Sequence, residues 1–307
     1  MKILMTGARG FLGSKLSASL TDAGHEAIGL TRGTATNPPS ATWDPASGAI
    51  ASGAVAGAEA VIHLAGENLG AGRWTTNRKR RFWDSRVGPT DKLSQFLAQQ
   101  EKPPRILVVA SAIGFYGDRG EEWLAESSSR GSGFLAELVD AWERASQPAA
   151  SAGIRVVQMR FGLILSSDGG ALGRMLLPFR LGLGGAMGSG SQYWSWVGID
   201  DVIGAVHHAL KTNALSGPVN VVAPNPVTQR EFSRVLARVL HRPAFFGTPS
   251  WVLRIALGEM ADEMLLSSAR VRPAKLMASG HVFRDDGLAS CLQRLLTARQ
   301  TRLAQTA

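Results

Sequence analysis

Residues 6–13, TGARGFLG, join a short apolar run at residues 2–5 to an amphipathic segment in which Leu12, Leu16 and Leu20 recur at helical spacing. The glycines at positions 7, 10 and 13 therefore stand at a turn between a buried parallel strand and a helix. Glycine at such a turn permits a tight bend, lets a phosphate approach the backbone and lets the helix pack closely on the sheet. The helix N-terminus adds N–H donors and partial positive charge. The pattern predicts a dinucleotide-binding site.

The residues after the second expected strand, 25–30, indicate which dinucleotide binds. An acidic residue there would hydrogen-bond the ribose 2′-hydroxyl of NAD, but the chain has Thr31 and Arg32 at this position. Arg32, together with Arg9 inside the glycine turn, can form charge-assisted bonds with a 2′-phosphate. The alternative is that both arginines are solvated surface residues. We expect NADP(H) to be preferred over NAD(H).

The composition is that of a globular protein. With 307 residues, 45% of them hydrophobic and 19% charged, the chain can bury a large core in one large or two coupled domains. Its single cysteine, Cys291, excludes an internal disulfide framework and predicts a reducing compartment. The N-terminus enters the first expected strand at once, and no apolar run reaches the roughly 18 residues needed to cross a bilayer. These features predict a cytoplasmic protein without a membrane partner.

The formal net charge of +9 would favour binding to polyanions, and RKRR at 78–81 forms a basic cluster. No nucleic-acid-binding motif accompanies this cluster, which lies in a polar helical stretch beginning near Thr75. A solvated helix face is therefore favoured over a nucleic-acid surface. The six histidines show no metal-type spacing with carboxylates or cysteines, so no metal site is expected.

Apolar runs and amphipathic stretches alternate through the first half of the chain. Strands are expected at 2–5, 25–30, 41–45, 60–64, 105–110 and 155–161, and helices around 12–20, 75–99 and 132–151. Gly88-Pro89 must bend or interrupt the second helix. This order predicts an α/β fold, a Rossmann-type doubly wound parallel sheet that binds ligands outside the carboxyl ends of its strands.

The second half of the chain changes character after Ser166. Residues 182–190 are too glycine-rich for a regular element and lead into the aromatic stretch 193–196. This combination suits either a lid over a ligand or a plain connection with core tryptophans. Helices are expected at 201–212, at 228–240 with a Thr228–Glu231 capping box, and within 249–298. The strongly apolar helix 252–266 is expected to close a smaller, mostly helical second domain.

Motifs along nearly the whole chain resemble those of extended short-chain dehydrogenases/reductases. They are TGARGFLG at 6–13, VIHLAG at 61–66, YGD at 116–118, WVGIDDV at 196–202 and GPVN at 217–220. AGEN at 65–68, LPFRLGLGG at 177–185 and VAPNPVT at 222–228 are similar to the atypical YfcH-like branch of the NAD(P)-dependent epimerases/dehydratases. The resemblance implies an NADP(H)-binding Rossmann domain over 1–165, completed by about 194–222. It also implies a substrate domain over 166–193 and 223–307.

The same resemblance implies cofactor contacts beyond the glycine turn. It assigns Thr31 and Arg32 to the adenosine ribose and Asp44 to the neighbourhood of the adenine. It also assigns residues 64–67 after the fourth strand, and Arg86, where extended enzymes carry asparagine before Val87. The complete set of expected cofactor-binding residues is Thr6, Gly7, Arg9, Gly10, Phe11, Leu12, Gly13, Thr31, Arg32, Asp44, Leu64, Ala65, Gly66, Glu67, Arg86 and Ser111.

The catalytic positions depart from the family pattern. Hydride-transferring members need a tyrosine that moves a proton, a lysine four residues later that lowers its pKa, and a serine that holds the substrate oxygen. Phe134 and Leu138 occupy the tyrosine and lysine positions, and neither can move a proton. Ser111 and Tyr116 are the candidate catalytic residues, although the usual serine position holds Ala112 and the Tyr-Gly-Asp tyrosine is usually structural. Substitute proton donors around Ser111 are Glu67, Tyr116, Arg86 and Tyr193.

Two functional hypotheses follow from an intact cofactor site with altered catalytic positions. The first is an NADP(H)-dependent epimerase or carbonyl reductase that acts on a small molecule, either a sugar nucleotide or a carbonyl compound. The second is a non-catalytic NADP(H)-binding regulator, with cell division suggested by descriptions of some relatives. The missing tyrosine and lysine favour the second hypothesis. A pure scaffold is least favoured, because a scaffold has no need of arginines at both 2′-phosphate positions.

Overall fold

Seven parallel strands form the centre of the computed structural model, which describes residues 1–33 and 39–306. The strands are β1 (Lys2–Thr6), β2 (Glu26–Thr31), β3 (Ser40–Thr42), β4 (Ala60–His63), β5 (Ile106–Ala112), β7 (Arg155–Phe161) and β11 (Gly217–Val221). Their order is β11-β7-β5-β4-β1-β2-β3, so the direction of winding reverses between β1 and β4. All neighbouring pairs run parallel, as in a doubly wound Rossmann-type sheet. The fold class expected from the sequence is confirmed.

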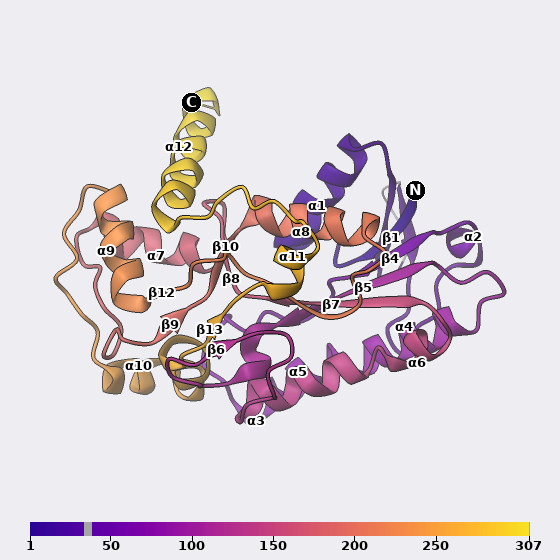
Figure 1. Cartoon of the computed structure of the whole chain (residues 1–307), viewed down its shortest axis with the longest axis horizontal. Coiled ribbons are helices and arrows are strands. Elements are labelled where there is room, and N and C mark those ends of the chain that lie inside the picture. The colour runs from indigo at the N-terminus through magenta and orange to yellow at the C-terminus, as the bar shows by residue number, and fades with distance from the viewer. Residues whose placement is uncertain (34–38, 307) are drawn as a thin grey trace.

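Helices cover both faces of the sheet, as Figure 1 shows. One face carries α1 (Phe11–Asp22) and α8 (Ile199–Lys211), and the other carries α4 (Val87–Ala98), α5 (Phe134–Arg144) and α6 (Gln147–Ser151). Leu16 and Val202 belong to the core on the first face, and Leu93 and Trp142 to the core on the second. The central strands are therefore buried on both sides, which explains their continuous apolar runs.

Two of the expected helices are each divided in two. The stretch expected at 75–99 forms α3 (Thr76–Asp84) and α4, with the break at Ser85-Arg86 and not at Gly88-Pro89. Pro89 lies in the first turn of α4, where an N–H has no partner within the helix, so proline is tolerated there. The stretch expected at 132–151 forms α5 and α6, and Pro148 lies in the first turn of the second of these helices.

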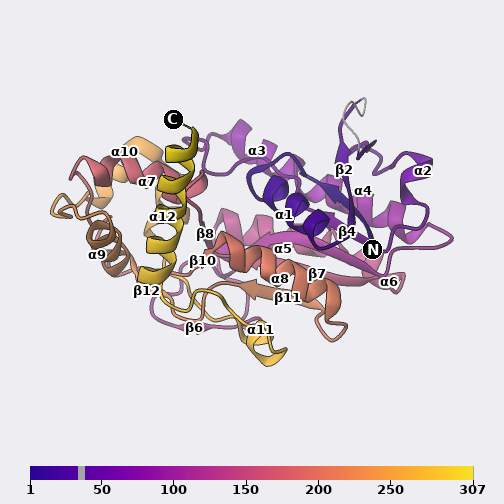
Figure 2. The same cartoon turned by 90° about the horizontal axis from the view of Figure 1, so that it is seen from above.

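In the C-terminal region (residues 223–306), residues 229–239 and 288–306 lie with α7 (Gly170–Arg180) at one end of the sheet, whereas residues 274–278 lie beside β11 (Figures 1 and 2). α9 (Gln229–Val239) and α12 (Leu288–Thr306) form its core with α7, around Trp194 and Trp196. Cys291 is part of the same core, and burial raises the pKa of its thiol. A Cβ on Gly185 would come within 2.3 Å of the Phe246 carbonyl oxygen. The glycine-rich stretch 182–190 is therefore a closely packed connection that leads into core tryptophans.

The apolar helix expected at 252–266 is not a single helix and does not close this region. α10 (Ser250–Leu257) ends at Gly258, which has a φ of +63°, and a short π-helical segment, η2 (Ala261–Leu266), follows. On α10, Trp251 and Ile255 are 63% and 66% exposed. The expectation was wrong because apolar composition does not determine whether a packing partner covers a helix face.

Short elements complete the described part of the chain. They are α2 (Ser52–Val55), η1 (Ile113–Tyr116), β6 (Trp123–Leu124), β8 (Leu163–Leu165), β9 (Tyr193–Trp194), β10 (Trp196–Gly198), β12 (Val227–Thr228), β13 (Arg270–Val271) and α11 (Ala274–Ala278). At the start of α9, the Thr228 hydroxyl accepts the Glu231 N–H at 3.2 Å, which is one half of the expected capping box. The short strands pair as β10–β8, β12–β9 and β13–β6, outside the central sheet.

Candidate functional site

The site begins at the crevice between β1 and β4, where the direction of winding reverses. In open α/β sheets, ligands bind outside the carboxyl ends of the strands at this point. Thr6 ends β1, and its hydroxyl accepts the N–H of Ala65 at 3.3 Å. A Cβ on Gly7 would lie 2.9 Å from the Leu64 carbonyl carbon. The glycine turn and residues 64–65 therefore meet backbone to backbone.

Two positions of the turn, Gly7 and Gly13, have no room for a Cβ. A Cβ on Gly13 would lie 2.1 Å from the Gly7 carbonyl oxygen, and a Cβ on Gly10 would lie 3.1 Å from the same atom. Gly7 has a φ of +70°, which side chains rarely adopt. Gly10 is the N-cap of α1 and provides no side-chain hydrogen bond. The N–H groups of Phe11 and Leu12, in the first turn of α1, have no acceptor within the helix. Gly10 beside them is exposed, so a phosphate could reach these donors.

The residues expected at the adenosine end lie on the surface beside this turn. Arg9 and Arg32 are both exposed, one within the glycine turn and one directly after β2, the strand paired with β1. Thr31 is half-buried at the end of β2. Asp44 is exposed, and its carboxylate accepts hydrogen bonds from the Ser47 hydroxyl at 2.7 Å and the Ala46 N–H at 3.0 Å. These bonds, the Ser47 bond foremost, lower the pKa of Asp44.

A buried guanidinium lies beneath the loop that follows β4. Arg86 is only 7% exposed, and it donates to the Glu67 carbonyl at 2.7 Å and to the Phe82 carbonyl at 3.3 Å. Burial lowers its pKa to about 10, against the attraction of Glu67, so the group stays charged at neutral pH. Its Nε is buried without a partner, and a Cβ on Gly66 would lie 3.2 Å from its Cζ. The Glu67 carboxylate lies 3.6 Å from Arg81. A buried charge with an unused donor fits an acceptor supplied by a ligand.

Ser111, at the end of β5, is joined to a buried ion pair. Its hydroxyl donates to Glu143 Oε1 at 2.6 Å. Arg160, on β7, donates to both oxygens of the same carboxylate at 2.7 Å. Arg160 and Glu143 are almost completely buried, and the two-bond geometry is the form in which such pairs are strongest. Neither charged residue was singled out from the sequence, because their pairing depends on how α5 packs against β7.

Tyr116 belongs to the same network. Its hydroxyl accepts from Arg160 at 3.0 Å, donates to Asn220 Oδ1 at 2.8 Å and lies 3.0 Å from the Ala125 carbonyl oxygen. The side chain is fully buried, and burial raises the pKa of the phenol despite the nearby arginine. Ser111 and Tyr116, the two candidate catalytic residues, are therefore linked through the buried Glu143–Arg160 ion pair. Their polar atoms already have partners inside the protein.

The first turn of α5 holds Phe134 at the position where related enzymes carry tyrosine. Glu263 of η2 reaches this turn, and its two carboxylate oxygens accept the N–H groups of Phe134 at 3.0 Å and Leu135 at 3.1 Å. Lys79 lies 4.6 Å from the centre of the Phe134 ring and pairs with Glu259 at 2.9 Å. The C-terminal region thus brings carboxylates to the first turn of α5. No local pattern pointed to Glu263, because its partners are 128 and 129 residues away.

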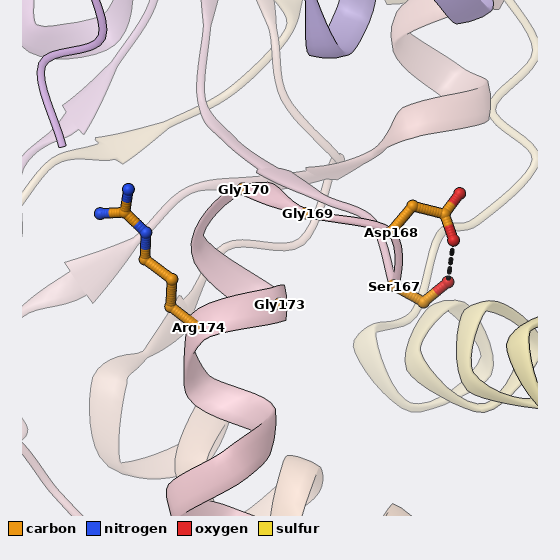
Figure 3. Close-up of a pocket in the computed structure, with 6 residues that line it drawn as sticks. All are labelled: Ser167, Asp168, Gly169, Gly170, Gly173 and Arg174. Carbon is orange, nitrogen blue, oxygen red and sulfur yellow. Dashed lines mark hydrogen bonds between the residues drawn. The ribbon is translucent and has the colours of Figure 1, made fainter. Parts of the chain in front are cut away.

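An open pocket of about 250 Å³ adjoins the glycine turn (Figure 3). It is lined by Ser167, Asp168, Gly169, Gly170, Gly173 and Arg174. Gly169 lies against the Phe11 ring, since a Cβ there would be 3.3 Å from it, so the pocket faces the start of α1. Arg174 donates to the Gly70 carbonyl and ties α7 to the loop after β4. The sequence signal that could have indicated this pocket is a second strand–glycine–helix pattern, with Gly169-Gly170 before α7.

Three of the histidines, His63, His207 and His208, hydrogen-bond to serine or threonine hydroxyls. His63 is buried between the hydroxyls of Thr6 and Thr90, at 2.7 and 3.0 Å, and burial lowers its pKa to about 4. His207 and His208 point to different partners, Ser19 and Ser279. Within residues 1–33 and 39–306, no three His, Cys, Asp or Glu side chains are grouped so that they could hold a metal ion. Over the same residues, no helix has the length and apolar character needed to cross a membrane.

The doubly wound sheet and the glycine turn at its switch point define a dinucleotide-binding protein of the extended short-chain dehydrogenase/reductase class. The profile of the NAD dependent epimerase/dehydratase family matches residues 3–223, and the chain belongs to this family. A second profile, a domain of unknown function called DUF1731, matches residues 248–295. The family expected from the motifs is confirmed.

Relatives are similar over almost the whole chain. Epimerase family protein ML0860 of Mycobacterium leprae is 37% identical over 295 residues, covering 96% of this chain and 95% of its own. The crystal structure of the human epimerase family protein SDR39U1 with NADPH has a TM-score of 0.88 and 34% identity, covering 96% of this chain and 99% of that chain. A nucleoside-diphosphate sugar epimerase from Corynebacterium glutamicum has a TM-score of 0.80 and 34% identity, covering 99% of this chain and 61% of that chain.

Proposed function

We propose that the protein binds NADP(H) in the crevice between β1 and β4 and acts on a small-molecule substrate as an epimerase or carbonyl reductase. The observation that carries the proposal is the β1–α1 turn. A side chain at Gly7 or Gly13 would collide with the backbone, and the uncapped helix start lies beside two exposed arginines, Arg9 and Arg32. The human relative was solved with NADPH, which supports the phosphorylated cofactor.

Each part of the cofactor has an assigned group of residues. The backbone at Gly10, Phe11 and Leu12 would hold the pyrophosphate, while Arg9, Thr31 and Arg32 would hold the 2′-phosphate end, with Asp44 near the adenine. Residues 64–67 and the Nε of Arg86, which has no hydrogen-bond partner in the described part of the chain, would contact the remaining part of the cofactor. Bound NADP(H) supplies or takes up a hydride.

The proposed domain boundaries follow the separate hydrophobic cores of the protein. Residues 1–165 and 194–222 would form the cofactor domain, and 166–193 with 223–307 the substrate domain, with residue 307 outside the described part of the chain. The core around α7, α9 and α12, distinct from the cores on the two faces of the sheet, supports this division. The buried Cys291 thiol supports the cytoplasm as the compartment.

A sugar nucleotide or another carbonyl compound is the proposed substrate. The Corynebacterium glutamicum relative, described as a nucleoside-diphosphate sugar epimerase, supports the first of these. The proton donor would come from elsewhere around Ser111, from Glu67 or Tyr193, because Phe134 and Leu138 cannot move a proton. Ser111 and Tyr116 would position β5 and β7 through the Glu143–Arg160 pair, since their hydroxyls already have buried partners.

The second candidate function is a regulator that binds NADP(H) without turning it over. The observation that favours it is the replacement of the proton-moving pair by Phe134 and Leu138, combined with the burial of the Tyr116 hydroxyl. Turnover separates the two functions. The protein would be incubated with NADPH and a panel of sugar nucleotides and carbonyl compounds, with cofactor oxidation and epimerised product both followed. Tight NADPH binding without turnover of any compound would establish the regulator in place of the enzyme.

Calorimetry with both cofactors tests the cofactor proposal. Loss of one charge-assisted bond in Arg32→Gln, about 1.5–3 kcal/mol, should weaken NADPH binding about 10- to 100-fold and leave NADH binding unchanged. Arg80→Gln is the matched control, because Arg80 is an exposed arginine on α3 paired with Asp84. Binding of NADH equal to or tighter than that of NADPH, or an Arg32→Gln variant with wild-type NADPH affinity, would reject the assignment.

A further inference from the structure

Large apolar side chains gather on the surface of the C-terminal region. Among the residues whose exposure the structure describes, 13 large hydrophobic side chains are exposed, and seven of them come from α7, the loop after it, the loop before α10, and α10 itself. We call these seven the apolar tip: Leu177, Leu181, Leu183, Phe245, Phe246, Trp251 and Ile255. All are at least 56% exposed, and Phe245 is 86% exposed. Concentrated apolar exposure of this kind marks a surface that meets a partner.

The apolar tip is one continuous surface. The loop before α10 runs along the loop after α7, because the Phe246 N–H donates to the Gly184 carbonyl at 3.2 Å and the Thr248 N–H donates to the Ala186 carbonyl at 2.7 Å. Arg242 Nε donates to the Arg180 carbonyl at 3.0 Å and joins the same two segments. Figures 1 and 2 both show α7 and α10 at the end of the molecule opposite β2 and α2.

The charged residues on the two segments that carry the apolar tip are all arginines. Residues 169–185 and 238–257 contain five arginines and no aspartate or glutamate. Four of these, Arg174, Arg180, Arg238 and Arg242, are exposed and take part in none of the ion pairs among residues 1–33 and 39–306. The next carboxylates along the chain, Glu259 and Asp262, are paired with Lys79 and Arg254. Exposed apolar side chains beside unpaired arginines complement a partner that has an anionic surface over an apolar interior.

We propose that the apolar tip docks on an anionic lipid bilayer. Phenylalanine, tryptophan and leucine side chains would enter the boundary between headgroups and acyl chains, and the arginines would contact the anionic headgroups. The aromatic side chains lie on a loop and at a helix start, and most of their surface is exposed. The fluid acyl chains of a bilayer can accommodate such side chains without a preformed pocket. This contact is peripheral. It departs from the membrane-free expectation drawn from the sequence, which considered spanning segments alone.

Charge argues against a second copy of the chain as the partner. A two-fold dimer places the same patch on both sides of its interface. Here that arrangement would bring the arginines of one copy against those of the other, with no carboxylate in either patch to neutralise them. An anionic bilayer removes this repulsion, because every arginine finds a negative headgroup. The proposal is independent of the cofactor site and of the reaction.

Vesicle flotation tests the proposal with the full chain. Vesicles of phosphatidylcholine containing 30% phosphatidylglycerol should carry the protein, whereas pure phosphatidylcholine vesicles should carry at least about tenfold less. Raising NaCl to 0.5 M should weaken the binding, since surface charges are then screened. The double variant Phe245→Ser/Phe246→Ser should bind at least about tenfold less than the wild type. Val282→Ser, at an equally exposed apolar residue between α11 and α12, should bind as the wild type does.

A second variant probes the charges without touching the rings. Arg180→Gln/Arg238→Gln should lower binding to the phosphatidylglycerol vesicles about threefold or more and leave binding to neutral vesicles unchanged. NADPH affinity, measured in parallel, should be the same in all variants. Absence of vesicle binding by the wild type would overturn the proposal, as would binding that survives both double variants. Concentration-dependent dimers that Phe245→Ser/Phe246→Ser abolishes, without vesicle binding, would identify a second copy as the partner and also overturn it.

Discussion

The β1–α1 turn and the segment from Ser250 to Leu266 are both rich in apolar residues, but the structure uses them in opposite ways. In the turn, Gly7 and Gly13 bring backbone against backbone, and Leu16 and Leu20 behind them are fully buried. In the segment, the helix ends at Gly258 after two turns, and Trp251 and Ile255 face outward. The first region is closely packed, with glycines where a Cβ would collide with backbone, and the second leaves large apolar side chains exposed.

The difference lies in how many neighbours constrain each region. β1 has a strand on either side and helices on both faces of its sheet, so every side chain of residues 3–6 is buried. α10 packs with η2 and contributes Leu253 to the interior, and no element of the described part of the chain covers Trp251 and Ile255 on its opposite face. An apolar run therefore indicates a buried element only where the topology supplies neighbours on every side. The following predictions test this contrast, from the largest expected effect to the smallest.

Gly13→Ala should have the largest effect of the changes considered. The new Cβ would lie 2.1 Å from the Gly7 carbonyl oxygen, and the turn can relieve this clash only by opening. We expect a loss of about 3 kcal/mol in the free energy of unfolding and no measurable NADPH binding. Urea unfolding and calorimetry measure the two quantities. Gly53→Ala, where a Cβ would meet nothing within 4 Å, is the control, and similar losses in both variants would contradict the closed turn.

His63 tests how completely the crevice beside the turn is buried. Burial lowers its pKa from the usual 6.5 to about 4. Between pH 6.5 and pH 4 the unfolded chain binds a proton that the folded chain does not, so stability should fall as the pH falls through this window, by about 3 kcal/mol. Below pH 4 this group should add no further change. Unfolding of wild type and His63→Gln at a series of pH values measures the effect. Parallel pH curves for the two proteins would show that His63 titrates normally.

Glu263→Gln tests whether η2 is tied to α5, one of the helices that cover the central sheet. The carboxylate accepts two N–H groups at the start of α5, and glutamine keeps only one acceptor oxygen and loses the charge. We expect a loss of about 1 kcal/mol in the free energy of unfolding. Asp262→Asn is the neighbouring control, because Asp262 is half-exposed and pairs with the exposed Arg254. Equal stabilities of the two variants would mean that Glu263 does not hold α5.

The smallest effect is expected from Trp251→Ser/Ile255→Ser. Both side chains are mostly exposed, so the free energy of unfolding should change by less than about 0.5 kcal/mol. Leu253→Ala, on the buried face of the same helix, should cost about 2 kcal/mol. Denaturant unfolding of the three proteins measures this. A large loss in the double variant would mean that the outer face of α10 is covered in the folded protein, and the contrast with the β1–α1 turn would then fail.

Expectations from the sequence were most accurate where local rules apply. The strands β1, β4 and β5 were expected within a few residues of their observed ends, because they are apolar runs bounded by polar or turn residues. The edge strand β11 was expected only from the resemblance to a known family. Helix breaks were less accurate, since the break falls at Ser85-Arg86, three residues ahead of Gly88-Pro89. The buried pair of Glu143 and Arg160 was missed, because it depends on how α5 lies on β7.

The sequence by itself determined the doubly wound sheet, the glycine turn and the arginines that flank it. The spacing of apolar residues indicates each strand and helix, and the lack of a Cβ in glycine indicates the tight turn, so a few neighbouring residues are enough to predict these features. Only the tertiary structure decided what the carboxylates and the apolar helix do. Glu263 meets Phe134 across 129 residues of chain, and the outward face of α10 results from the absence of a covering element there among the described residues. Contacts at such separations depend on packing, which no local pattern encodes.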